Sequence, residues 1–224
     1  MSPDNAFDPA RARAYMVQRQ LRARGITDER VLAAMGSVPR ERFVASELRE
    51  QAYEDGALAI GHGQTISQPW VVAAICQGLE LTGTERVLDV GAGSGYSSAV
   101  LAELAREVLA VELIGALARR ARRVLAELGY ENVEVREGDA SAGVPGEEPF
   151  DAIAVHAAAP RVPAGLVAQL RPGGRLVVPI ASDGADMLTA FRRVDEGSEH
   201  PMLERYVIAP CRFVPLLGAG GYSG

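Results

Sequence analysis

The sequence predicts an α/β protein built on a doubly wound, mostly parallel sheet. Three observations favour this fold class. Stretches typical of strands alternate with stretches typical of helices from residue 86 onward, a glycine-rich turn follows the first of these strands, and two late strands have no long helix between them. Such alternation indicates parallel strands connected by helices, and the two late strands predict an antiparallel edge. Helical patterns before residue 56 predict an N-terminal helical preface.

The composition is that of a globular protein. The chain has 224 residues, of which 48% are hydrophobic and 23% charged, and these values are ordinary for one large domain. We expect a single domain over residues 1–224, with the helical preface at about 9–55, a polar, glycine-containing loop at about 56–69 and an α/β core at about 84–217.

The preface carries recognisable helix boundaries. Asp8 and Pro9 form a typical N-cap and first-turn pair, Thr27 and Asp28 open a second helix, and Gly25 and Gly36 are typical helix ends. These signals predict helices over residues 10–24 and 28–36, with a third short helix at 46–53.

The core is expected to alternate in the same way. Helices are expected over residues 70–79, 95–105, 113–128 and 163–170, and strands over 87–90, 108–111, 132–136, 150–155, 174–180, 187–194 and 205–214. The stretch 56–69 is too polar for a core strand and is expected to be a loop. Residues 1–8 are expected to be disordered and residues 218–224 to form a frayed tail.

Charge, cysteine content and hydropathy exclude several classes of protein. The chain has no run of about 18 apolar residues, the length that a membrane-spanning helix needs, and its N-terminus lacks the apolar core of a signal peptide. Cys76 and Cys211 form neither a disulfide framework nor a metal-ligand spacing. All 23 basic residues are arginine, which excludes lysine chemistry, and the net charge of −6 argues against a general nucleic-acid binder. We therefore expect a cytoplasmic protein without a metal site.

The glycine-rich turn predicts a ligand site. Gly91, Gly93 and Gly95 follow the first core strand, and glycines there let the backbone approach a ligand closely. A P-loop would need a lysine, and a dinucleotide fold would need a glycine at position 96, which is Tyr96. The pattern D-x-G-x-G-x-G from Asp89 suits S-adenosylmethionine, which has no pyrophosphate. Asp89 would act on the ligand's ammonium group, directly or through water, or orient the loop.

Two further carboxylates follow neighbouring strands. Glu112 ends the second core strand, where it can accept both ribose hydroxyls of a nucleoside. Asp139 follows the third strand and can accept from the adenine amino group, while the backbone N–H of Ala140 can donate to the ring. A surface charge for Glu112 and a helix cap for Asp139 are the plainer alternatives. Their position at successive strand ends, where open α/β sheets bind ligands, favours the binding role.

Over about residues 9–218 the sequence resembles the protein-L-isoaspartate O-methyltransferase family. The motifs that carry the resemblance are MV (16–17), QL (20–21), VPRERFV (38–44), AYED (52–55), IGHGQTISQP (60–69), VLDVGAGSG (87–95), FDAI (150–153), AAAP (157–160) and RFVPL (212–216). The glycine motif is weakly specific, whereas residues 60–69 are strongly specific. The resemblance implies a Rossmann-like methyltransferase fold and methyl transfer from S-adenosyl-L-methionine to the α-carboxylate of L-isoaspartyl residues in damaged proteins and peptides.

The resemblance also implies roles for particular residues. Ser67 matches the family's active-site serine. The residues expected to contact the substrate are His62 at the pocket wall, Thr65, Ile66 and Gln68 beside Ser67, His156, and the backbone near Val214. The residues that match cofactor positions are Asp89, Gly91, Gly93, Ser94, Glu112, Leu113, Asp139 and Ala140. No metal, nucleic acid or membrane is implied, and we expect a monomer.

A serine suits this chemistry. The nucleophile is a carboxylate, which is already ionised at neutral pH and needs no general base. It needs orientation, which the Ser67 hydroxyl can supply by a hydrogen bond to one oxygen, whereas a strong cation in contact with it would quench the nucleophile. The alternative for Ser67 is an N-cap of the helix at residues 70–79.

Two departures from the family's pattern put the range of substrates in question. His156 stands where the family usually has threonine, and a packed wall residue is the commoner role for such a histidine. Residues 140–149 lack the family's usual aromatic side chains, so the adenine side is expected to be less tightly covered.

Other functions remain as alternatives. A relative that methylates an aspartate in a dedicated precursor peptide stays open because of His156. A nucleic-acid methyltransferase is disfavoured because the Asp/Asn-Pro-Pro-aromatic turn is absent, and a metal-dependent enzyme acting on small molecules because Asp151 is the only carboxylate near strands four and five. A cofactor-binding protein without catalysis is disfavoured by the intact Ser67 stretch.

Overall fold

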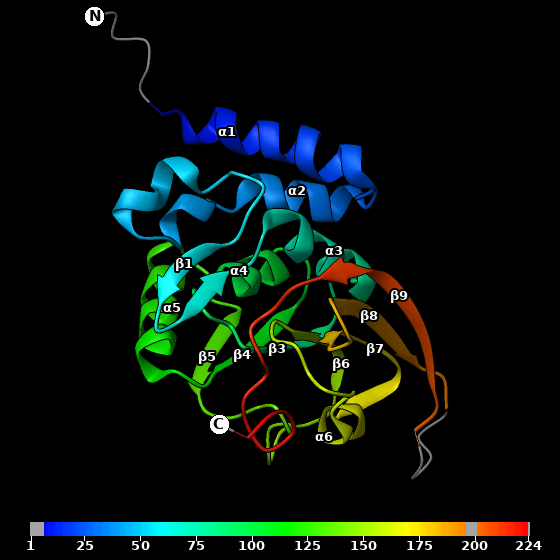
Figure 1. The fold of residues 1–224 in the computed structure, drawn as a ribbon. Helices are drawn as coiled ribbons and strands as arrows, with labels where there is room; N and C mark the ends of the chain where they lie inside the picture. The colour runs from blue at the N-terminus through cyan, green and yellow to red at the C-terminus, as the bar shows by residue number, and fades with distance from the viewer. Residues whose placement is uncertain (1–6, 196–200, 224) are drawn as a thin grey trace, which may run out of the picture.

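The structure, a computed structural model, describes residues 7–195 and 201–223. Its centre is a seven-stranded sheet with the order β5-β4-β3-β6-β7-β8-β9 (Figure 1). The strands are β3 (Arg86–Val90), β4 (Glu107–Glu112), β5 (Val133–Glu137), β6 (Phe150–Val155), β7 (Leu170–Ile180), β8 (Asp186–Arg193) and β9 (Leu203–Cys211). Strands β3 to β7 pair in parallel, and β8 and β9 are antiparallel. The predicted fold class is therefore confirmed.

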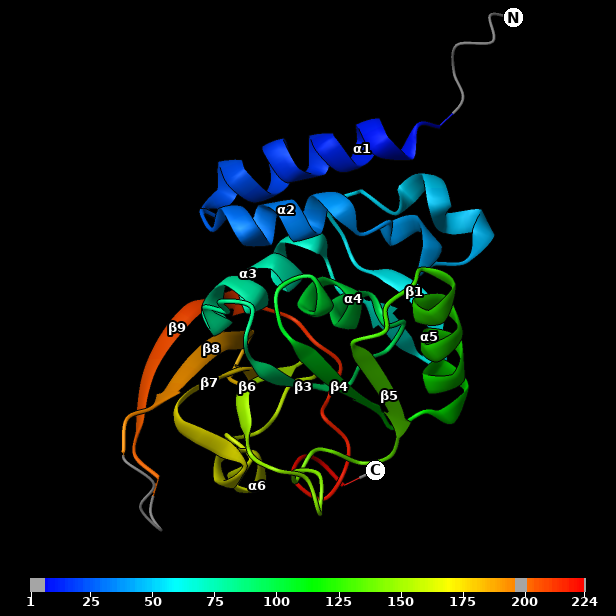
Figure 2. The same cartoon turned by 180° about the vertical axis from the view of Figure 1, so that it is seen from behind.

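Each face of the sheet has its own hydrophobic core. Alternate side chains of a strand point to opposite faces, so Val87 packs in one core and Leu88 in the other. The first core lies under helices α3 (Pro69–Leu79), α4 (Tyr96–Ala102) and α5 (Gly115–Glu127), and the second is covered by the short helix α6 (Ala164–Ala168) (Figure 2).

The preface forms an outer helical layer over α3 and α4 (Figures 1 and 2). Its elements are α1 (Pro9–Tyr15), the π-helix η2 (Met16–Leu21), the 3₁₀ helix η3 (Arg22–Arg24), α2 (Glu29–Ser37), and the 3₁₀ helices η4 (Arg40–Arg42) and η5 (Ser46–Gln51). The carboxylates of Asp8 and Asp28 accept backbone N–H groups at the starts of α1 and α2, as expected of N-caps. In the described ranges, no helix has the length and apolarity to cross a membrane.

Residues 56–69 differ from the expected loop because they contain a hairpin of their own. Strands β1 (Leu58–Gly61) and β2 (Gln64–Ile66) pair with each other, apart from the main sheet. The turn residues His62 and Gly63 have φ of 54° and 71°, as a tight hairpin turn requires. Only Ile60 and Ile66 of these strands are buried, so the polarity that argued against a core strand is compatible with a hairpin.

Both expectations for the chain termini need correction. Residues 218–223 are not frayed but fold back, because the N–H of Tyr222 donates to the Leu216 carbonyl at 2.7 Å and that of Gly220 donates to Ser141 Oγ at 2.9 Å. Phe7 packs against the core and Asp8 caps α1, so these two residues are ordered. The rest of the expected disorder, at residues 1–6, and the last tail residue, 224, lie outside the described residues.

Gly95, the last glycine of the turn, offers a test of the packing between the turn and α5. Its φ is 88°, and a Cβ would lie 3.0 Å from the Ala121 Cβ. We expect Gly95→Ala to lower the free energy of unfolding by about 2–4 kcal/mol, from backbone strain and crowding together. The matched control is Gly129→Ala, where φ is 80° but no atom lies within 4 Å, and where about 1–2 kcal/mol of strain is expected. If urea unfolding gave equal losses for Gly95→Ala and Gly129→Ala, this would contradict a contribution from crowding against Ala121.

Candidate active site

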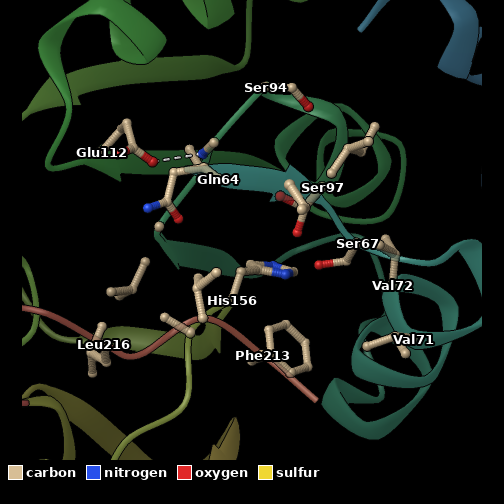
Figure 3. Close-up of a pocket in the computed structure, with 18 of the residues that line it drawn as sticks. Gln64, Ser67, Val71, Val72, Ser94, Ser97, Glu112, His156, Phe213 and Leu216 are labelled. Atoms are coloured by element: carbon tan, nitrogen blue, oxygen red, sulfur yellow. Dashed lines mark hydrogen bonds between the residues drawn. The ribbon is translucent and has the colours of Figure 1, made fainter. Parts of the chain in front are cut away.

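The glycine turn lies where the order of the sheet reverses. It follows β3, which has β4 on one side and β6 on the other, and such a switch point leaves a crevice at the carboxyl ends of the strands. A cavity of about 320 Å³ lies there, bordered by residues of the preface, the hairpin, the core strands and the chain end (Figure 3). Its volume is at the lower end of the usual range for small-molecule sites.

Glu112 ties together the two loops on the predicted cofactor side. It is 5% exposed, and its Oε2 accepts the Gly93 N–H at 2.7 Å while its Oε1 accepts the Ile114 N–H at 2.8 Å. A carboxylate can accept about four hydrogen bonds, so two positions remain for hydroxyls of a ligand. Figure 3 shows Glu112 at the edge of the cavity, with its bond to the turn drawn.

Asp89 lies beneath the cavity and does not border it. It is fully buried, and its Oδ2 accepts the hydroxyls of Ser98 at 2.6 Å and Ser97 at 3.2 Å. Its Oδ1 is 3.1 Å from His156 Nε2, an ion-pair distance without the alignment of a hydrogen bond. Of the roles that the sequence left open for Asp89, its contacts support orientation of neighbouring segments, and its direct contact with a ligand stays a prediction. Asp89 holds the start of α4 through its hydrogen bonds with Ser97 and Ser98.

The chain end covers the predicted adenine side. Asp139 Oδ1 accepts the Ser141 N–H at 2.8 Å, and its Oδ2 accepts the Ala219 N–H at 2.9 Å. Burial acts to raise the pKa of Asp139, but the hydrogen bonds from Ser141 and Ala219 outweigh it and hold this pKa below its ordinary value. Leu216 and Leu217 border the cavity nearby, so these two side chains supply apolar surface on the side that the segment 140–149 was expected to cover less tightly.

Ser67 lies on the opposite side, directly after the hairpin. Its hydroxyl points into the cavity toward His156 (Figure 3) and makes no hydrogen bond with any residue that the structure describes. Helix α3 begins at Pro69 with Gln68 as its N-cap residue, so Ser67 is not the N-cap. The side chain is therefore available to a ligand.

The residues around Ser67 complete this wall. The Gln68 amide donates to Asp55 Oδ1 at 2.7 Å, which fixes the loop, and the Val214 carbonyl accepts the Ala158 N–H at 2.8 Å. His62, in contrast, is exposed at the tip of the hairpin and does not border the cavity. Its expected place at the pocket wall is wrong because the hairpin turn carries it into solvent.

The cavity brings most of the predicted residues together. Those that border it are Thr65, Ile66, Ser67, Gln68, Gly91, Gly93, Ser94, Glu112, Leu113, Asp139, Ala140, His156 and Val214. Residues that the sequence did not single out also border it: Arg24, Gln64, Trp70, Val72, Ser97, Phe213, Leu216 and Leu217. Gln64, Phe213 and Leu216 fall inside the motifs at residues 60–69 and 212–216, and this was a usable signal in the sequence. For Arg24 and Trp70 the sequence gave no such signal.

Comparisons with known proteins agree with this architecture. The family model described as protein-L-isoaspartate(D-aspartate) O-methyltransferase matches residues 12–220. A protein-L-isoaspartate O-methyltransferase 1 of Rhodopseudomonas palustris is 49% identical over 221 residues, which cover 98% of this chain and 89% of the relative. A protein of the same name from Anaeromyxobacter is 52% identical over 206 residues, or 92% and 96% of the two chains.

Solved structures agree as well. A protein-L-isoaspartate O-methyltransferase superposes with a TM-score of 0.81 at 30% identity, covering 93% of this chain and 67% of the other. A Plasmodium falciparum protein described as a beta-aspartate methyltransferase, solved with S-adenosyl-L-homocysteine, superposes with a TM-score of 0.77 at 25% identity, covering 92% and 98%. The chain belongs to the protein-L-isoaspartate(D-aspartate) O-methyltransferase family.

Proposed function

We propose that this protein transfers a methyl group from S-adenosyl-L-methionine to the α-carboxylate of L-isoaspartyl residues in damaged proteins and peptides. Membership of the family supports this activity, as does the S-adenosyl-L-homocysteine in the Plasmodium relative. The observation that carries the proposal is the Ser67 hydroxyl, which faces a cavity that Glu112 and the glycine turn border on the other side.

The residues at the turn fit this cofactor. Glu112 keeps acceptor positions for a ribose diol, Asp139 and the Ala140 N–H suit an adenine edge, and Gly91 and Gly93 allow close approach of the amino-acid end. When bound, the cofactor supplies an electrophilic methyl group.

The acceptor side has to orient an anion. The α-carboxylate is ionised at neutral pH, so its attack on a methyl group needs no general base. The Ser67 hydroxyl holds one carboxylate oxygen and leaves the other free to attack, which is catalysis by positioning. Val72 and Phe213 border the same part of the cavity with apolar surface (Figure 3), and this surface limits access of water.

The product explains why methylation repairs the damage. The methyl ester loses methanol spontaneously and closes to a succinimide, which can reopen as ordinary aspartate. That step needs no residue of this protein. The protein partners are the isoaspartyl substrates themselves.

A labelled-cofactor assay tests the proposal. An isoaspartyl peptide and its aspartyl twin are offered separately, and we expect label to enter the isoaspartyl peptide alone. Equal labelling of both peptides, or labelling of neither, would contradict the proposal. Labelling of neither would return the precursor-peptide alternative to consideration.

A further inference from the structure

Arg40 in η4 is a buried cation with no carboxylate partner in the described part of the chain. It is 0% exposed and forms no ion pair there, and its Nη1 lacks a hydrogen-bond acceptor. Burying a charge without a counter-ion costs free energy, and such groups are enriched at functional sites. Burial lowers the pKa of Arg40, but a guanidinium remains protonated in proteins.

Three segments around the site meet at this side chain. Its Nε donates to the Ala52 carbonyl at 2.6 Å and its Nη2 donates to the Ser67 carbonyl at 2.8 Å. Its guanidinium carbon lies 4.8 Å from the ring centroid of Tyr96, the first residue of α4. Arg40 therefore joins the preface, the Ser67 loop and the helix that follows the glycine turn.

The charge is close to the acceptor position without reaching it. Arg40 does not border the cavity, whereas Ser67 and Tyr96 do. It holds Ser67 by the main-chain carbonyl, and the Ser67 hydroxyl faces the cavity. A buried charge acts on an anion that it does not contact, because the dielectric constant of the protein around it is low.

We infer that Arg40 is a positioning residue for the methyl acceptor, which it attracts as an anion and aligns through Ser67. The inference rests on the proposed function, because it concerns an acceptor that is a carboxylate. Attraction without a hydrogen bond leaves the lone pairs of the acceptor oxygen free for the methyl group.

Two other arginines border the cavity and are the rival sources of this attraction. Arg24 is half exposed, ion-paired with Asp55 at 2.8 Å and stacked on Trp70 at 5.1 Å. Arg212 is exposed. Salt screens exposed charges much more than buried ones, which separates their effect from that of Arg40.

The test measures the preference for a charged acceptor. Calorimetry with saturating S-adenosyl-L-homocysteine compares an isoaspartyl peptide with its neutral isoasparaginyl twin. We expect Arg40→Met to reduce the preference of the wild type for the carboxylate about tenfold. The matched control is Arg42→Met, which removes an exposed arginine paired with Glu127 at 3.0 Å and leaves the preference unchanged.

The conservative variant separates charge from alignment. Arg40→Lys retains the cation, so the preference is kept, but one ammonium group cannot hold both the Ala52 and the Ser67 carbonyls in the fork of a guanidinium. We therefore expect kcat to fall while KM for the peptide stays close to that of the wild type. Loss of the preference in Arg40→Lys together with normal kcat would overturn the inference.

A second measurement uses the wild type alone and remains valid if Arg40→Met does not fold. The preference is measured in about 0.05 M and about 0.5 M salt, and a buried cation predicts that it persists. Its loss in salt, its loss in Arg212→Met, or its retention in a folded Arg40→Met would overturn the inference. A wild type that methylates isoaspartyl peptides while Arg40→Met keeps the preference refutes this inference alone, whereas an inactive wild type refutes the proposed function.

Discussion

We expect Ser67→Ala to lower kcat about a hundredfold, the scale of loss when a reacting group is misplaced. The affinity for S-adenosyl-L-homocysteine should stay within a factor of about two, because Ser67 and Glu112 lie on opposite sides of the cavity (Figure 3), and sites that share no partner act independently. The hydroxyl has no hydrogen-bond partner among the described residues, so its removal leaves no buried group unsatisfied. Steady-state kinetics with an isoaspartyl peptide and calorimetry with the product nucleoside measure the two quantities.

A matched control for this variant is Ser46→Ala. The Ser46 hydroxyl donates to Glu47 on the surface and does not border the cavity, so kcat should not change. If Ser67→Ala instead loses nucleoside binding together with kcat, the serine has a structural role and the proposed orientation of the carboxylate is wrong.

Glu112→Ala has the second large expected effect, on cofactor affinity. Each charge-assisted hydrogen bond to a ribose hydroxyl is worth about 1.5–3 kcal/mol, so the loss of both weakens binding by at least about a hundredfold. The structure adds a second contribution, because the same carboxylate holds the N–H groups of Gly93 and Ile114. Removing it frees both loops in the unliganded protein.

Calorimetry with S-adenosyl-L-homocysteine measures this loss. Glu137→Ala is the control, since Glu137 ends the neighbouring strand β5 and is exposed outside the cavity. Unchanged affinity in Glu112→Ala would remove Glu112 from the site, and an equal loss in Glu137→Ala would indicate a general electrostatic effect in place of a specific contact.

The sequence predicted the sheet because strands and helices differ in hydrophobic period. It did not predict the hairpin at Leu58–Gly61 and Gln64–Ile66, because two buried isoleucines are too few for a periodic signal. The folded chain end was missed for a different reason. Its contacts with Asp139 and Ser141 use the backbone N–H groups of Ala219 and Gly220, which almost any residue type could provide.

At the site, the sequence predicted which residue types are present better than it predicted where their side chains point. Asp89 alternates with Leu88 and Val90, so it shares the face of Val87, the face that α3 and α4 cover. This alternation is a usable signal, because a carboxylate on that face has to lie under α4, next to Ser97 and Ser98. His62 had no such signal, since its direction depends on the left-handed turn that it forms with Gly63.

The cavity draws its walls from nearly the whole chain, from Arg24 in the preface to Leu217 near the end. A ligand that touches these walls is bound only by fully folded molecules, so its binding free energy adds to the stability of the entire protein. At a ligand concentration a hundred times Kd, this linkage amounts to about 2.7 kcal/mol. A higher concentration of the methyl donor therefore lowers the fraction of unfolded molecules, which are the ones open to proteolysis, and also affects the rate of the reaction.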